Sequence, residues 1–144
     1  MPLPVTLTIA AACALVNLWL AGRVVPGRLR GVAVGDGGDP RMTATMRAHA
    51  NFAEYAPIVL VLIAAIELSG GGATWLWVAG AVFVLGRLAH ALGMTRPSPN
   101  PLRAGGIIST WLVTAILAVW ALTLAYAAVR PATTDPVPVE APRG

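Results

Sequence analysis

The segment RAHANFAEY, which begins at Arg47, brings several polar side chains into a long apolar run. If the segment is helical, successive residues are about 100° apart around the axis, and three polar residues fall within about 80° of Arg47: Asn51, Glu54 and Tyr55. His49 falls at about 200° and faces elsewhere. A guanidinium, an amide, a carboxylate and a phenol on one stripe can bind a charged ligand or pass a proton.

The surrounding chain indicates that this stripe lies in a membrane. The 144 residues are 57% hydrophobic and 11% charged, which excludes an ordinary soluble domain. Four apolar segments, 3–22, 43–68, 73–94 and 104–129, are each long enough to cross a bilayer as a helix. They predict one all-α domain over residues 1–130, an integral membrane four-helix bundle. The proline-rich tail, 131–144, is expected to be disordered.

Arginine positions predict the topology. All ten basic residues are arginine, and the connections 23–42 and 95–103 hold most of them. Because arginine is retained on the cytoplasmic side, we expect a multi-pass inner-membrane protein with both termini outside and both of these connections inside. The arginines are then topology determinants and anion ligands, and nucleic acid is not an expected partner.

Further cations gather in the same cytoplasmic half. The segment GRLAHALGM places Arg87 and His90 on one helix face, and other arginines stand at the helix ends on that side: Arg28, Arg30 and Arg103. A charge near the bilayer centre costs roughly 2.5 to 3.5 kcal/mol, so the stripe should face the bundle interior or another subunit. Glu54 alone opposes these cations, and the predicted site is therefore short of anions.

Three interpretations of this site remain open from the residues. The favoured one is a bound anionic ligand, such as a small peptide-like molecule with two carboxylates and one amine. In the second, Arg47 pairs with Glu54 and Arg87 extends to the membrane surface, which makes the group purely structural. In the third, Glu54 carries protons in a small proton-coupled exporter.

RAHANFAEYAP and GRLAHALG, in this order on successive predicted helices, resemble signatures of the MAPEG superfamily, the membrane-associated proteins in eicosanoid and glutathione metabolism. The likeness covers residues 3–129 and includes the connection GDGGDP, typical of bacterial members. It implies a homotrimer that binds glutathione, as co-substrate, between subunits near the cytosolic face. A lipophilic substrate would enter from the bilayer, next to apolar residues such as Trp111.

The resemblance also implies roles for individual residues. Arg103 would be catalytic, because a guanidinium beside the glutathione thiol favours the attacking thiolate. Three positions depart from the eicosanoid enzymes, since Ala50, Met94 and Ala104 replace polar or hydroxylated residues. The implied glutathione ligands are Arg28, Arg47, Asn51, Glu54, Tyr55 and His90.

The expected function is therefore a glutathione transferase or peroxidase acting on lipophilic electrophiles, with a detoxifying role. The alternative is a glutathione- or anion-binding membrane protein without turnover. No metal site is expected, because Asp36 and Asp39 suit a turn and a helix N-cap. Asn17 is expected to bond across helices, and Glu67 to be solvated.

Overall fold

The computed structural model describes residues 2–71 and 73–129, and their regular structure consists of four α-helices. These are α1 (Pro4–Leu29), α2 (Pro40–Leu68), α3 (Ala73–Met94) and α4 (Pro101–Val129). The predicted all-α class and the count of four are confirmed. All four helices are long and apolar enough to cross a membrane. The tail 131–144, expected to be disordered, lies outside the described residues.

Three of the helices are longer than the apolar segments predicted. α1 continues seven residues beyond 22 and contains Pro26 in its last turns. It ends where Gly31 adopts a φ of 96°, a conformation that favours glycine. α2 and α4 begin three residues early at Pro40 and Pro101, because proline suits the first helical position. The hydropathy pattern had marked the apolar part of each helix and missed the polar turns.

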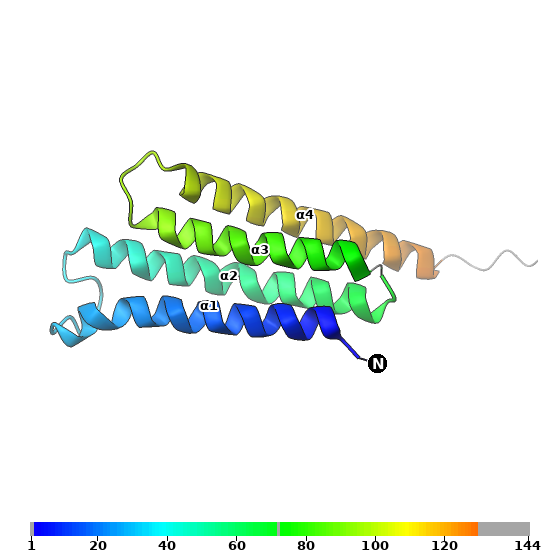
Figure 1. Ribbon diagram of the computed structural model, residues 1–144, viewed down its shortest axis with the longest axis horizontal. Helices are drawn as coiled ribbons and strands as arrows, with labels where there is room; N and C mark the ends of the chain where they lie inside the picture. The colour runs from blue at the N-terminus through cyan, green and yellow to red at the C-terminus, as the bar shows by residue number, and fades with distance from the viewer. Residues whose placement is uncertain (1, 72, 130–144) are drawn as a thin grey trace, which may run out of the picture.

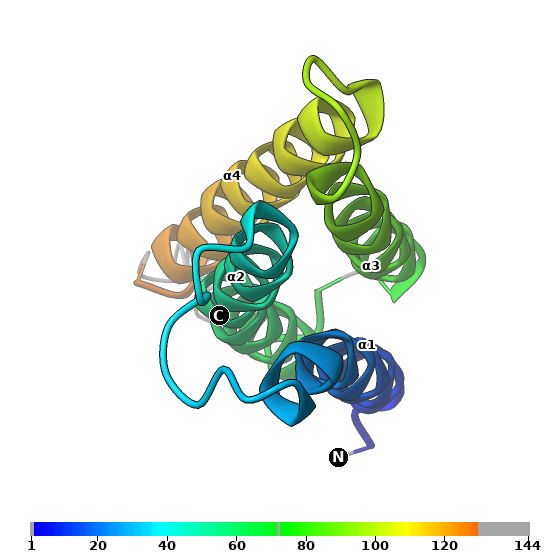
Figure 2. The ribbon, with the colours of Figure 1, turned by 90° about the vertical axis from the view of Figure 1, so that its left-hand side faces the viewer.

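The helices lie side by side and run alternately up and down (Figure 1). The connections 30–39 and 95–100 lie at one end of the bundle, whereas the start of α1 and the end of α4 lie at the other. Seen from the end, α2 and α3 separate α1 from α4 (Figure 2). The two arginine-bearing connections therefore share one end, as the antiparallel prediction requires.

The backbones of α3 and α4 approach very closely. Gly106 of α4 lies against Gly86 and His90 of α3, and a Cβ atom there would come within 2.5 Å of the Gly86 carbonyl oxygen and the His90 amide nitrogen. Gly93 makes a similar contact with the backbone of Arg103. Small residues allow such an approach between membrane helices, where packing replaces the hydrophobic effect.

Cross-helix hydrogen bonds connect α1 to α2. Glu67 accepts from the backbone N–H groups of Val5 and Thr6 at 2.9 and 2.8 Å, and so caps α1, whose own N-cap residue provides no acceptor. Glu67, expected to be solvated, is partly exposed and in addition bonds across the two helices. Asn17 accepts from His49 across the same pair of helices at 2.9 Å, which confirms its expected role.

Side-chain hydrogen bonds order the connection 30–39. Asp39 is the N-cap of α2 and accepts from the Arg41 amide at 2.8 Å, as predicted. Asp36 accepts from the Gly38 amide at 3.0 Å and from the Thr43 hydroxyl. These bonds, the one from Thr43 first, hold the pKa of Asp36 below its ordinary value.

Candidate functional site

Arg87 of α3 is the centre of a network that joins three helices. Only 1% of its surface is exposed. One terminal nitrogen donates to the Asn51 side-chain oxygen of α2 at 2.7 Å, and the other donates to the Thr110 hydroxyl of α4 at 3.2 Å. The guanidinium also lies 5.8 Å from the centre of the Tyr55 ring. Arg87 does not extend to the membrane surface, so that interpretation was wrong.

The network depends on the close approach of α3 and α4. Thr110 stands one turn after Gly106, and Arg87 directly follows Gly86, so the glycine contact brings the hydroxyl and the guanidinium together. Thr110 also donates to the Gly106 carbonyl at 2.8 Å. Its oxygen therefore accepts from Arg87 while its proton is already used.

These hydrogen bonds fix which donors remain for a ligand. Because the Asn51 oxygen accepts from Arg87, the Asn51 NH₂ group must point away from it. Trp111 of α4 donates its indole N–H to the Tyr55 oxygen at 2.8 Å, which leaves the Tyr55 hydroxyl proton free to donate elsewhere. An amide and a phenol on α2 are thus held ready to donate.

Arg87 itself retains one hydrogen-bond donor without a partner. Its Nε atom is buried and has no hydrogen-bond partner. Within residues 2–71 and 73–129, no carboxylate forms an ion pair with it. A buried guanidinium of this kind keeps its charge and adds positive potential beside Asn51 and Tyr55.

Arg47 and Glu54 lie on the same stripe of α2 but are exposed in the single chain. The part of the chain that the structure describes contains no ion pair between them. The geometry therefore does not support the interpretation in which Arg47 and Glu54 simply neutralise each other. Two exposed charges on an apolar helix are costly to place in lipid.

His90 and Arg103 meet through the backbone. The His90 Nδ1–H donates to the Arg103 carbonyl oxygen at 3.1 Å, since a carbonyl can only accept. The His90 ring is buried, whereas the Arg103 side chain is exposed in the first turn of α4. The hydrogen bond fixes the backbone position of Arg103. The Arg103 guanidinium remains exposed and can contact a ligand.

Arg28 lies apart from this network. It occupies a groove of about 500 Å³ between α1 and α2, and the groove wall on α2 consists of Met46, His49, Ala50 and Ala53. Its guanidinium donates to three carbonyl oxygens of the connection, those of Val32, Ala33 and Gly35, at 2.9 to 3.2 Å. Around α2, this wall and the stripe that begins at Arg47 face different directions.

Thr110 and Arg87 are the members of the network absent from the predicted ligand set. The sequence contains a signal for each: an arginine deep in a predicted span must find hydrogen-bond acceptors, and a threonine in the facing helix can provide one. Which threonine faces Arg87 depends on the register of α3 against α4, which the Gly86–Gly106 contact sets.

Comparison with known proteins identifies a matching family and two similar proteins. The sequence pattern of the MAPEG family matches residues 6–123. The chain is also 35% identical over 80 residues to inner membrane protein YecN of Escherichia coli strain K12, and equally to YecN of E. coli O6:H1 strain CFT073. Each match covers 56% of this chain and 60% of the length of the relative.

Proposed function

Because the chain belongs to the MAPEG family, we propose that it is a membrane-bound, glutathione-dependent transferase or peroxidase that acts on lipophilic electrophiles. The observation that carries the proposal is the buried network of Arg87, Asn51 and Tyr55. It holds a guanidinium that forms no direct ion pair within residues 2–71 and 73–129, an amide donor and a phenol donor next to the exposed Arg47 and Glu54. These groups suit a small, doubly acidic molecule that also carries an amine.

Glutathione has that set of charges, with two carboxylates, one ammonium group and peptide amides. The Arg47 guanidinium and the Asn51 NH₂ group would bind a carboxylate through charge-assisted hydrogen bonds. Glu54 would accept from the ammonium or from a peptide N–H, and the Tyr55 hydroxyl would donate. Arg87 is a positioning residue here, because it is buried and acts through Asn51 and Tyr55.

We propose that the complete site forms between copies of the chain in a homotrimer. Within one chain the Arg28 groove and the Arg47 stripe face different directions around α2. A neighbouring copy can bring its Arg28 against this stripe and shield Arg47 and Glu54 from lipid. Each interface would then contribute one composite site, and a monomer would bind glutathione poorly.

Arg103 would stabilise the thiolate. Its side chain is exposed, and its backbone is anchored by His90 and Gly93. A free thiol has a pKa near 8.5, and a guanidinium in a site of low dielectric lowers it, so the thiol proton passes to solvent at neutral pH. The thiolate sulfur then forms a bond to the electrophilic carbon of the co-substrate, and a leaving group such as halide departs with the bonding electrons.

The membrane placement follows from the same reasoning. The four candidate spans and the two relatives named inner membrane protein favour an inner-membrane location. The arginine bias of the connections 30–39 and 95–100 favours a cytoplasmic position for that end of the bundle, with both termini outside. The site would then face the cytoplasm, and the co-substrate would arrive through the bilayer near Trp111.

The decisive experiment compares Arg103→Ala with Arg96→Ala in purified, detergent-solubilised protein. Calorimetric titration with glutathione measures binding, and the rate of conjugation to an electrophilic aryl halide measures turnover. We expect glutathione to bind, Arg103→Ala to lower the rate about 100-fold with a much smaller loss of affinity, and Arg96→Ala to resemble the parent. Absence of glutathione binding by the parent would contradict the proposal, and binding without turnover would leave the non-catalytic alternative.

A further inference from the structure

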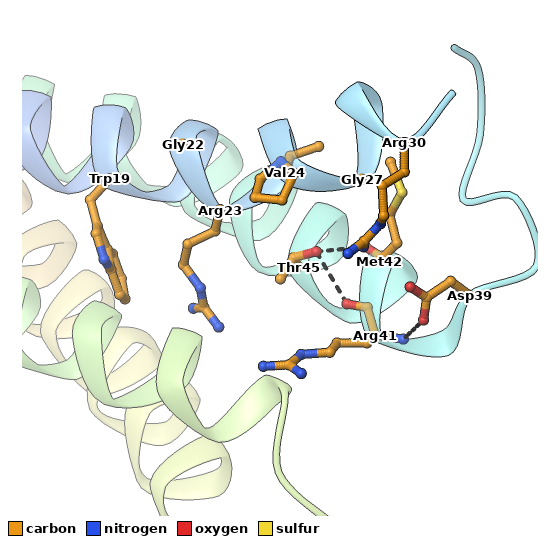
Figure 3. A pocket seen from close by; sticks show the side chains of 11 residues that line it. Trp19, Gly22, Arg23, Val24, Gly27, Arg30, Asp39, Arg41, Met42 and Thr45 are labelled. Atoms are coloured by element: carbon orange, nitrogen blue, oxygen red, sulfur yellow. Dashed lines mark hydrogen bonds between the residues drawn. The ribbon is translucent and has the colours of Figure 1, made fainter. Parts of the chain in front are cut away.

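A second group of arginines lies in a cavity that contains none of the proposed glutathione ligands. The cavity has a volume of about 680 Å³ and lies between the last turns of α1 and the first turns of α2 (Figure 3). Its size is within the usual range for a small-molecule site. Its charged residues are Arg23, Arg30, Arg41 and Asp39.

Arg23 is held in place inside this cavity. Its terminal nitrogens donate to the Ala91 carbonyl in the last turn of α3 at 3.0 Å and to the hydroxyl of Thr95, the residue after α3, at 3.2 Å. The guanidinium also lies 5.0 Å from the centre of the Trp19 ring. These contacts use two of the five N–H donors of Arg23 and leave the others for a ligand.

Arg41 points toward Arg23, as Figure 3 shows. The guanidinium groups of Arg30 and Arg41 donate no hydrogen bond to any residue within 2–71 or 73–129. Among residues 2–71 and 73–129, Asp39 is the one acidic residue that lines the cavity, and its carboxylate already caps α2 through the Arg41 amide. Three cations against one carboxylate leave two positive charges uncompensated, which favours a phosphate ligand.

Exposed apolar residues of α1 lie on the same helix face as part of the cavity wall. Gly22 of α1 lines it, and Leu18 and Leu15, one and two turns earlier, lie within about 40° of Gly22 around the helix axis. Leu15 and Leu18 are 70% and 68% exposed. Trp19 is also partly exposed, and tryptophan is enriched where the hydrocarbon meets the headgroups. An acyl chain can follow α1 from the cavity toward the bilayer centre.

We propose that this cavity binds the phosphate of an anionic phospholipid, with the headgroup between Arg23, Arg30 and Arg41 and an acyl chain along Leu18 and Leu15. Basic pockets between membrane helices bind such headgroups through charge-assisted hydrogen bonds. The leaflet is the one next to the connections 30–39 and 95–100. The proposal does not depend on glutathione binding, because the two sites share no residue.

The test measures lipid binding by native mass spectrometry of the full chain in detergent, titrated with phosphatidylglycerol, phosphatidylcholine or inorganic phosphate. We expect phosphatidylglycerol to bind most tightly. The double substitution Arg30→Gln with Arg41→Gln should weaken this binding about 30-fold. Arg96→Gln is the matched control, because Arg96 is exposed in the connection at the same end and does not line the cavity. It should bind like the parent.

Asp39→Asn tests the same charge argument in the opposite direction and does not depend on how the arginine variant folds. Asparagine caps a helix as well as aspartate does, so α2 should persist while one negative charge leaves the cavity. Phosphatidylglycerol should bind about fivefold more tightly. Equal binding of the two lipids, equal losses in the Arg96→Gln control, or no gain in Asp39→Asn would overturn the proposal. Inorganic phosphate binding as tightly as phosphatidylglycerol would indicate a soluble ligand and overturn the lipid assignment.

Discussion

Arg87 and Arg28 carry the same charge in the same half of the bundle, but the groups that hold them differ. Arg87 donates to side chains on α2 and α4 and is 1% exposed, so moving it requires the helices to separate. Arg28 donates to three carbonyl oxygens of the connection 30–39, and two of these hydrogen bonds are solvent-exposed. The comparison indicates that helix packing fixes the position of Arg87. Arg28 can instead replace its carbonyl partners with the carboxylate of a ligand.

The same comparison explains how the proposed site could combine order and adaptability. Arg87 orients Asn51 and supports Tyr55 before any ligand arrives, which reduces the entropy lost on binding. Under the proposed function, Arg28 would exchange its carbonyl partners for a ligand carboxylate, which would release the connection 30–39. The predictions below test this contrast, and they are ordered from the largest expected effect to the smallest.

Arg87→Ala should cause the largest loss. It removes a fully buried side chain and leaves the Asn51 oxygen and the Thr110 hydroxyl without their partner, a change expected to cost about 3 kcal/mol of stability. Glutathione affinity should fall because Asn51 loses its orientation. Thermal unfolding in detergent and calorimetric titration measure the two effects.

Arg87→Lys is the control for charge. Lysine keeps the positive charge but cannot donate to Asn51 and Thr110 in the same fork geometry. It should recover part of the stability and little of the affinity. If Arg87→Lys bound glutathione like the parent, orientation of Asn51 would not be the function of Arg87.

Gly106→Ala should have the next largest effect. A Cβ atom there would meet backbone atoms of Gly86 and His90, which cannot move as a side-chain end can. Separation of α3 from α4 should cost about 1–3 kcal/mol and weaken the Arg87–Thr110 hydrogen bond. Thermal unfolding measures the loss.

Gly105→Ala is a closely matched control, because a Cβ atom on Gly105 meets nothing within 4 Å. Alanine favours helix over glycine, so this variant should equal or exceed the parent in stability by up to about 1 kcal/mol. Equal losses in both variants would contradict the assigned register of α3 against α4.

The sequence predicted the fold well because hydropathy and arginine placement depend on local residues alone. The four spans follow from apolar length, and their alternating order follows from the placement of the arginines. The polar helix ends were missed, since Arg23 and Arg28 look like loop residues to hydropathy although α1 continues through them to Leu29. Helix termini outside the hydrocarbon are set by capping and proline, which apolar length does not report.

The sequence predicted which types of side chain form the site, but not which of them are joined by hydrogen bonds. Helical spacing correctly placed Asn51 and Tyr55 on one face, and both contact Arg87. Spacing could not show that Thr110 completes the network, because that depends on backbone contact between two helices. It also could not show that Arg28 lies against a different side of α2, because that depends on how α1 packs against α2.

Glutathione should release the connection 30–39 if Arg28 exchanges its partners. Hydrogen–deuterium exchange at the backbone amides of 31–38 should become faster on adding glutathione, whereas amides near Asn51 should become slower or stay unchanged. Arg28→Gln should show fast exchange without ligand and only a moderate loss of affinity. Slower exchange of the connection in the presence of glutathione would show that Arg28 keeps its carbonyl partners.

The smallest expected effect concerns pH and the same connection. Asp36 has a pKa below its ordinary value because its carboxylate accepts from Thr43 and Gly38. A depressed pKa in the folded state stabilises the connection at pH values above the unfolded pKa, and this contribution is lost as pH falls through the folded pKa. Exchange of the amides 31–38 should therefore accelerate, after correction for intrinsic rates, in the acidic range below the ordinary aspartate pKa.

Asp36→Asn should remove this acid dependence and leave exchange in α3 unchanged. An asparagine side chain does not titrate, and the contacts of the Asp36 side chain are confined to the connection and the first turn of α2. If the dependence persisted in this variant, another acidic group would have to control the order of the connection.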